Sequence, residues 1–215
     1  MKRLLRNSSF FFLLLSVLSL VACKTRAYEG LQNGDLLFVT AKNTGLSGAI
    51  NNVTQKTDVA NFDHVGIIKK EGKNYYVLHA APKGGSQKQD LESFIEDQAS
   101  EGQGIVSYRL KPEFQSTISA ALENAEKLLG KPYNFNYILN DNSLYCSDFI
   151  ERIFRQNHIF KLEPMTFIDP KTGKTNEFWQ EFYRKKGLKV PEGELGCNPN
   201  GLASSEKIFL VKVLK

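Results

Sequence analysis

Residues 140–154 read NDNSLYCSDFIERIF, and this stretch joins a polar loop to a cysteine and an apolar helical pattern. Its apolar side chains recur at helical spacing, at Phe149, Ile150, Ile153 and Phe154. That spacing predicts an amphipathic helix that begins near Cys146 and buries one face. The run NDNS ahead of it holds several candidate capping residues. Cys146 therefore has three possible roles: packing, half of a disulfide, or nucleophile.

The expected position of Cys146 at a helix start favours nucleophilic chemistry. A cysteine attacks as the thiolate, and a helix N-terminus or a neighbouring imidazole lowers the pKa of its thiol. The backbone N–H groups of a helix start can also stabilise the oxyanion formed in acyl transfer. We therefore expect a lowered thiol pKa at Cys146 if a histidine lies beside it.

Two of the three histidines lie in strand-like runs that can form one hairpin. These runs are DHVGIIKK (63–70) and NYYVLHAA (74–81), and the residues EGK between them suit a hairpin connection. On such a hairpin His64 and His79 would be neighbours, so that one ring faces the thiol and the other orients it. A single histidine in a strand is more often only a hydrogen-bonded residue. The pair together with Cys146 favours a catalytic group.

The rest of the chain predicts an α+β domain. Strands are expected in GDLLFVT (34–40), GIVSYRL (104–110) and EKIFLVKVL (206–214), and helices within 43–55, 90–97, 112–129 and 175–187. The strands cluster in the first half and at the end, with helices mainly between them. This order favours α+β over a regular βαβ array.

The N-terminus has the layout of an export signal. Residues 1–22 contain three positive side chains and an apolar run from Phe10 to Ala22, which is too short for a comfortable membrane span. The run ends in LVAC, which resembles a bacterial lipobox, so Cys23 is the expected lipidation site; an ordinary signal peptide cleaved after TRA (25–27) is the alternative. We expect a tether over 23–30 and one domain over 31–215.

Charge and motif spacing argue against several other classes of protein. Without residues 1–22 the formal net charge falls from +5 to +2, and the remaining basic residues are scattered, which does not suggest a nucleic-acid partner. The histidine and cysteine spacings form no metal motif. PKGGSQKQ (82–89) lacks the order of a nucleotide-binding loop. We expect no metal and no cofactor.

Five segments occur in an order that is similar to a known family: GDLLFVT, FDHVGIIKK, YYVLHAAPKG, GKPYNF and LYCSDFIERIF. In this order the chain resembles the circularly permuted papain-like amidases of the YiiX/YaeF type, within the NlpC/P60 superfamily. The resemblance covers about Gly34 to Phe154, and we expect it to include the tail CNPNGLASSEKI (197–208) as well. It implies a papain-like fold with an antiparallel sheet or small barrel packed against helices.

The same resemblance implies roles for individual residues. Cys146 matches the nucleophile, His64 the base and His79 the third polar position, where some permuted relatives have a glutamate instead. A neutral His79 would not stabilise an imidazolium with a full negative charge. Tyr133 and Tyr145 are candidates for the substrate cleft or for oxyanion binding, although packed tyrosines with bonded hydroxyls are equally expected.

Three functions remain open from the sequence. The leading one is a cell-envelope cysteine hydrolase that cleaves an amide in a peptide or peptidoglycan fragment. Lipid on Cys23 would hold the protein at a membrane. Lys24 after that cysteine resembles the sorting pattern for the outer membrane, which is the expected location. The second is a lipid acyl hydrolase or acyltransferase, which an apolar cleft would favour. The third is a non-catalytic envelope binding module in which Cys146 and Cys197 form a disulfide.

Overall fold

The computed structural model describes residues 28–54, 61–99 and 102–215. The chain divides into two units, and the unit formed by Gln32–Val213 with Lys215 contains the following elements. The strands are β1 (Leu36–Thr40), β2 (Phe62–Glu71), β3 (Asn74–Ala81), β4 (Gly85–Asp90), β5 (Ile105–Leu110), β6 (Glu163–Pro164), β7 (Leu195–Gly196) and β8 (Ile208–Val213). The helices are α2 (Gly45–Thr54), α3 (Leu91–Ala99), α4 (Ile118–Lys127), α5 (Cys146–Phe154), α6 (Glu177–Lys185) and α7 (Pro199–Ala203), with 3-10 segments η1 (Pro112–Thr117) and η2 (Arg155–Asn157).

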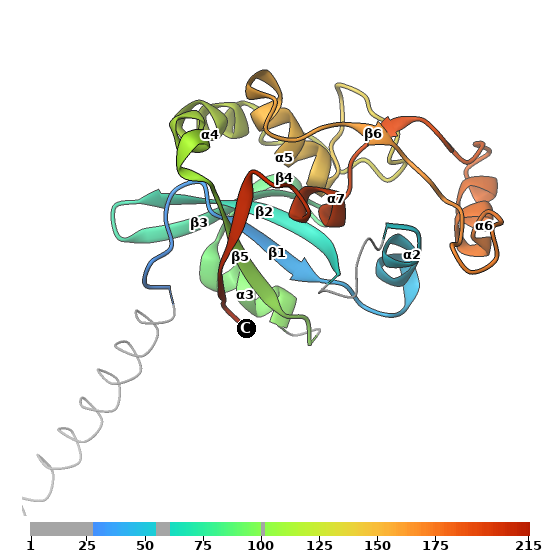
Figure 1. The fold of residues 1–215 in the computed structure, drawn as a ribbon, viewed down its shortest axis with the longest axis horizontal. Coiled ribbons are helices and arrows are strands. Elements are labelled where there is room, and N and C mark those ends of the chain that lie inside the picture. The colour runs from blue at the N-terminus through green and yellow to red at the C-terminus, as the bar shows by residue number, and fades with distance from the viewer. Residues whose placement is uncertain (1–27, 55–60, 100–101) are drawn as a thin grey trace, which may run out of the picture. The chain divides into compact units, whose positions relative to one another are not determined.

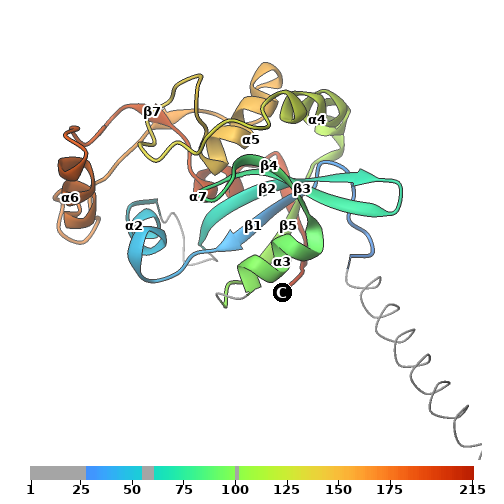
Figure 2. The same cartoon turned by 180° about the vertical axis from the view of Figure 1, so that it is seen from behind.

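Six strands form one antiparallel sheet in the order β4-β3-β2-β1-β5-β8. In Figures 1 and 2, α4 and α5 lie over one face of this sheet and α3 lies against the other. Strands β6 and β7 pair separately as a short antiparallel ribbon. The predicted α+β class, with an antiparallel sheet packed against helices, is confirmed.

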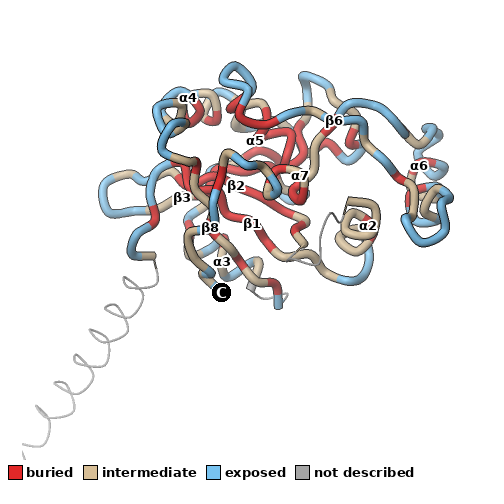
Figure 3. Tube along the Cα trace, viewed as in Figure 1, coloured by how far each residue is buried: buried red, intermediate tan, exposed pale blue. Residues whose placement is uncertain are grey.

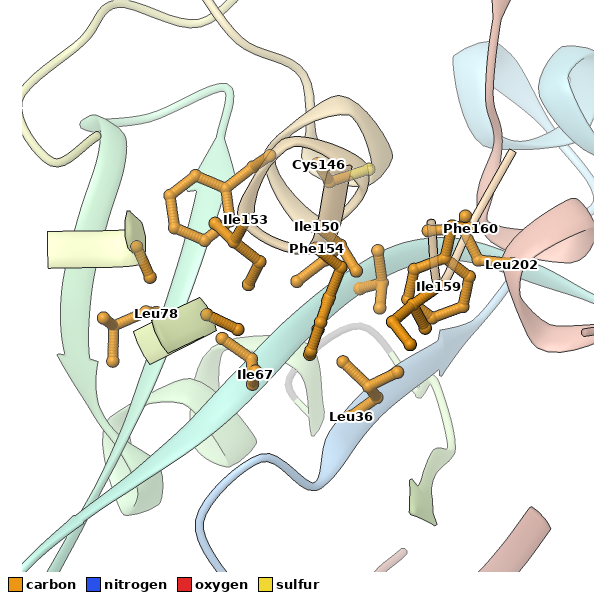
Figure 4. Close-up of a cluster of buried hydrophobic side chains, with 14 of the residues drawn as sticks. Leu36, Ile67, Leu78, Cys146, Ile150, Ile153, Phe154, Ile159, Phe160 and Leu202 are labelled. Carbon is orange, nitrogen blue, oxygen red and sulfur yellow. The ribbon is translucent and has the colours of Figure 1, made fainter. Parts of the chain in front are cut away.

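Helix α5 supplies the centre of the main hydrophobic core. Its apolar stripe is completely buried, at Phe149, Ile150, Ile153 and Phe154. Figure 4 shows Ile150, Ile153 and Phe154 pointing from the helix toward Leu36 of β1 and Ile67 of β2. Figure 3 shows that α5 and the strands beneath it form a largely buried layer. Each such side chain contributes about 1.5–3 kcal/mol of transfer free energy, so the stripe holds the helix on the sheet.

The β2–β3 hairpin forms as predicted. Glu71 pairs with Asn74, so the connection is the two-residue turn Gly72–Lys73. Gly72 has a φ of 61°, a left-handed conformation that glycine adopts without steric cost and that tight hairpin turns require. The backbone pairing of the two strands continues to Ile67 and Leu78.

The loop before α5 is braced by side chains, although none of them caps the helix. Asn140 accepts hydrogen bonds from the backbone N–H groups of Asn142 and Ser143, both at 2.9 Å. Arg152 reaches back from α5 to the Asp141 carboxylate at 3.0 Å and the Asn140 carbonyl at 2.7 Å. The N-cap itself is Tyr145, which makes no side-chain capping bond. The expectation that NDNS supplies a helix cap is therefore wrong, because the side chain of Asn140 bonds to backbone N–H groups of the loop and not to those of the helix.

The region predicted as one helix over 112–129 divides into η1 and α4. The Thr117 hydroxyl donates to the Phe114 carbonyl at 2.7 Å, and the Ile118 N–H bonds to the Gln115 carbonyl, three residues back. The hydroxyl thus occupies the carbonyl that a continuous α-helix would offer to Ile118. Such local side-chain bonds compete with helical backbone bonds, which explains the break.

Two elements near the active region were not predicted. Strand β4 carries GSQKQD, which has no apolar alternation, and it forms because its backbone pairs with β3 from Ala81↔Gly85 to Tyr76↔Asp90. Helix α7 lies in the tail, where Asn200 accepts a hydrogen bond from the Phe62 N–H at 2.7 Å and so fixes the start of β2.

Within the described ranges, no helix combines the length and the apolar character that a bilayer span needs. The expected signal peptide and the expected lipidation site Cys23 lie outside the described residues.

Candidate active site

Cys146 is the first residue of α5, and only 4% of its surface is exposed. Tyr145 precedes it in an extended conformation, with φ −101° and ψ 169°, so the chain turns directly from an extended residue into the helix. The thiol donates a weak hydrogen bond to the carbonyl oxygen of Asp63, with Sγ and O 3.8 Å apart. The backbone N–H groups of Ser147, Val65 and Cys146 also act on the sulfur and favour its anionic form. The nucleophile candidate therefore lies between a helix start and the backbone of β2.

The structure brings the two histidines of the hairpin together. Nε2 of His64 lies 2.8 Å from Nδ1 of His79, within hydrogen-bonding distance, and the rings meet edge to face. This contact occurs beyond Ile67 and Leu78, where the backbone pairing of β2 with β3 ends. Nε2 of His79 in turn lies 3.1 Å from Oε1 of Gln89 on β4. Sequence reasoning missed Gln89, because a glutamine in a polar run carries no sign that it lies beside a histidine of the preceding strand.

No hydrogen bond joins Cys146 to His64 among the described residues. The residues that contact the sulfur, Asp63 and Val65, are the two chain neighbours of His64. The only ring nitrogen of His64 that is bonded is Nε2, which leaves Nδ1 without a hydrogen bond in the described part of the chain. In unliganded enzymes catalytic hydrogen bonds are often long and tighten when substrate binds. The arrangement is compatible with that behaviour.

The electrostatics of the site differ from the sequence expectation. Burial, together with the nearby charge of Asp63, raises the pKa of the Cys146 thiol to about 12, against the opposing effect of the backbone N–H groups. Burial lowers the pKa of His64 well below its usual value, with a further contribution from His79, and it lowers the pKa of His79 to about 4. The expected lowered thiol pKa is therefore wrong for this state, because desolvation outweighs the helix start. At neutral pH the thiol and both imidazoles are neutral.

A cavity of about 680 Å³ opens beside Cys146. Its apolar lining comes from aromatic and aliphatic side chains, including Tyr133, Tyr137, Tyr145, Phe160, Phe167, Trp179, Ile50, Val53, Ile159, Met165 and Leu202. Polar and charged residues also line it, among them Asp63, Ser147, Asn198, Lys161, Glu163, Glu206 and Lys207. A substrate with an apolar part would find it complementary, with the thiol at its polar margin.

Both tyrosines predicted to line the cleft do line this cavity. The Tyr145 hydroxyl accepts a hydrogen bond from the Cys197 N–H at 3.3 Å, so that hydroxyl also holds the tail segment in place. Burial raises the pKa of Tyr133 well above its usual value, so its hydroxyl is a neutral donor. Tyr137, which sequence reasoning missed, packs against both rings, with centroid distances of 6.4 Å to Tyr133 and 5.6 Å to Tyr145. Its φ of 56° brings it there, and the sequence gives no signal for that conformation.

Cys146 and Cys197 are both free thiols in the structure. Cys197 also lines the cavity, and its carbonyl oxygen accepts a hydrogen bond from the Ser147 hydroxyl at 3.0 Å. The structural disulfide considered as an alternative is therefore absent from the described chain, and with it the feature on which the binding-module interpretation depended.

Comparison with known proteins supports a single family. Residues 30–212 match the family model described as permuted papain-like amidase enzyme, YaeF/YiiX, C92 family. No curated protein sequence matches the chain significantly. A crystal structure described as metalloprotein yiiX from Escherichia coli O157:H7 is similar over 84% of this chain and 96% of that chain, with 21% identity and a TM-score of 0.68. At that identity the likeness concerns the fold, which is papain-like, as the resemblance implied.

The residues of this chain do not fit the metal site that the name of that structure implies. Over 28–54, 61–99 and 102–215, no group of three or more His, Cys, Asp or Glu side chains is placed to hold an ion. His64 and His79 direct ring nitrogens at one another instead of toward a common point.

We expect Cys146 of the substrate-free protein to alkylate slowly at neutral pH. A raised thiol pKa means less thiolate at pH 7 than in a free cysteine, and the labelling rate should rise about tenfold per pH unit through pH 9, beyond the point where a free thiol of pKa about 8.5 levels off. The measurement is iodoacetamide labelling of a Cys23→Ser protein from pH 6.5 to 10, with Cys146 and Cys197 peptides quantified by mass spectrometry. Rapid labelling of Cys146 below pH 8 that slows in His64→Ala would instead reveal a thiolate–imidazolium pair.

Proposed function

This chain belongs to the permuted papain-like amidase family, and on that basis we propose that it is a cysteine hydrolase that cleaves an amide bond through an acyl-enzyme on Cys146. The observation that carries the proposal is the position of Cys146 at an uncapped helix start, against the strand that carries His64. Nucleophile, base and oxyanion donors are the parts that acyl transfer needs, and we assign these roles to Cys146, His64 and the N–H groups at the start of α5.

The reaction divides into two half-reactions. In the first, Nδ1 of His64 takes the Cys146 proton as Sγ attacks the amide carbonyl, and the resulting imidazolium then gives that proton to the leaving nitrogen as the C–N bond breaks. In the second, His64 removes a proton from water, which attacks the thioester and regenerates the thiol. The N–H groups at the start of α5 stabilise the oxyanion in both steps. His79 orients the His64 ring throughout.

Burial determines when the proton moves from Cys146 to His64 in the proposed reaction. Because the pKa of the thiol is raised and that of His64 is lowered, a free thiolate–imidazolium pair is unfavourable before substrate binds. Proton transfer therefore accompanies attack on the carbonyl, when the negative charge moves from sulfur to an oxygen that backbone N–H groups can stabilise.

The substrate class is proposed from the family and from the expected location of the protein. A peptide amide, in particular a fragment of a peptidoglycan stem, suits an amidase exported to the bacterial cell envelope. The support for export is the basic start, the apolar run and the LVAC sequence of residues 1–23.

Loss of the nucleophile or of the base should remove amide hydrolysis. We expect Cys146→Ala to reduce hydrolysis of stem-peptide amides to background, and His64→Asn to lower kcat by about 10²–10⁴-fold, the usual range for a general base. Activity is followed by release of the free amine, and the acyl-enzyme by a mass increase on Cys146 after rapid quenching. His158→Asn is the matched control, because His158 is exposed and lies outside the site. Full activity in Cys146→Ala would disprove the mechanism.

The apolar cavity favours a second candidate, in which the scissile bond belongs to a lipid acyl group. Val53, Ile159 and Leu202 contribute aliphatic surface to the cavity that adjoins the thiol. A fatty acyl chain bound there would place its carbonyl at the polar margin, where Cys146 lies. The same nucleophile would then hydrolyse the acyl group or transfer it.

An acyl series separates the two candidates. If an acyl chain occupies the cavity, kcat/KM for N-acyl amides of one amine should rise about fourfold per added methylene, which is about 0.8 kcal/mol, until the cavity is full. Val53→Trp should shorten the preferred chain, whereas Val213→Trp, at a position 64% exposed, should not. A flat series with preference for stem peptides would exclude the lipid candidate.

The lipid anchor is tested independently of catalysis. We expect wild-type protein expressed in a bacterial host to incorporate labelled palmitate and to fractionate with membranes, with the outer membrane as the proposed location. Cys23→Ser should lose both properties because the acceptor thiol is gone, while Cys197→Ser should keep them. A mature N-terminus after Ala27 without lipid would show an ordinary signal peptide instead.

A further inference from the structure

The side chain of Gln89 bridges His79 and an acidic residue of α3. Its Oε1 lies 3.1 Å from Nε2 of His79, and its Nε2 donates to Oδ2 of Asp97 at 2.7 Å. With the bond between His79 and His64, a continuous series of side-chain hydrogen bonds runs from Asp97 to the candidate base. The series crosses α3, β4, β3 and β2 in turn.

The series has only one consistent direction. The Asp97 carboxylate accepts hydrogen bonds and donates none when ionised, so it fixes the NH₂ group of Gln89 on its own side. The carbonyl oxygen of that amide must then face His79, where it accepts from Nε2–H. A neutral imidazole carries a single N–H, so Nδ1 of His79 is left as an acceptor for Nε2–H of His64. The proton of His64 is thereby placed on Nε2, and Nδ1 keeps its lone pair.

We propose that Gln89 and Asp97 are positioning residues that hold both imidazoles in one tautomer, so that Nδ1 of His64 is kept free to accept the Cys146 proton. This inference rests on the proposed function, since it names what sets the state of the base in that reaction. In the opposite tautomer His64 would carry its proton on Nδ1 and could not act as a base toward the thiol.

Two further features support this assignment. Phe94 of α3 packs against both imidazoles, with centroid distances of 6.1 Å to His64 and 5.2 Å to His79, so ring rotation is restricted. His79 is almost completely buried, and burial holds its pKa to about 4, so it is neutral in the working range and has one proton to place. The negative charge of Asp97 opposes that shift in the pKa of His79. Asp97 lies at the far end of the hydrogen-bonded series, so its charge is more distant from His64 than that of a carboxylate bonded directly to the base would be.

The test measures the tautomers and the kinetics of the same full-length variants. Because the chain has three histidines, ¹⁵N-histidine spectra can be assigned by removing each in turn. In wild type we expect His64 and His79 both to be protonated on Nε2. In Gln89→Met we expect a second tautomer of both rings, and a loss in kcat of about tenfold to a hundredfold with KM about unchanged, a part of the general-base contribution.

Matched variants separate positioning from a structural effect. Gln87→Met makes the same substitution on β4 at a glutamine that bonds the Lys83 carbonyl, and Glu96→Gln removes a charge from α3 beside Asp97. Both should behave as wild type. The double variant Gln89→Glu with Asp97→Asn exchanges donor and acceptor, and it should restore both the tautomer and most of kcat.

Each result decides the proposal. A wild-type His64 protonated on Nδ1, or Gln89→Met with unchanged tautomers and kcat, would overturn it even if the hydrolase mechanism holds. If Gln89→Met and the double variant Gln89→Glu with Asp97→Asn lose activity to the same extent, and the tautomers of both histidines are unaltered, the role of Gln89 is merely structural and the proposal is wrong. Failure of the proposed function is recognised separately, by hydrolysis that persists in Cys146→Ala, because the tautomer spectra need no substrate.

Discussion

The packing of α5 on β2 is the contact on which the rest of the site depends. It places the first residue of the helix against the backbone of Asp63 and Val65, the two chain neighbours of His64, which is more than eighty positions earlier in the chain. The apolar stripe of α5 holds the helix there, and Arg152 ties the preceding loop back to it. Because that loop satisfies its own polar groups, none of its side chains caps the N–H groups at the helix start.

That packing also explains why the site is neutral in the described state. Burial disfavours every charged form, and here it dominates the shifts at Cys146, His64 and His79. In such a low-dielectric region a charge that develops during reaction interacts strongly with fixed donors, so oriented N–H groups and a fixed tautomer matter more than a standing ion pair. The series behind His79 supplies orientation, and Asp97 supplies charge at its far end.

Family membership and cavity chemistry constrain different parts of the function. Membership in the permuted papain-like amidase family supports a class of reaction, the hydrolysis of an amide bond by a cysteine hydrolase. The identity of the acyl group depends on the surface that receives it, and a papain-like fold leaves that surface free to vary. Here the receiving surface is largely apolar, with aromatic rings from Tyr137 and Trp179 among its walls. Substrate preference is therefore a question about the cavity.

The sequence by itself determined the features that local patterning controls. The helix after Cys146, the hairpin that carries His64 and His79, and the α+β class follow from side-chain periodicity and turn residues, which act over a few positions. Tertiary structure alone decided what depends on distant contacts. It turned the capping candidates of 140–143 toward their own loop, and it brought Gln89 to His79 through backbone pairing that has no side-chain signature. It also raised the pKa of Cys146, because burial is a property of everything packed around a group, and no stretch of sequence records it.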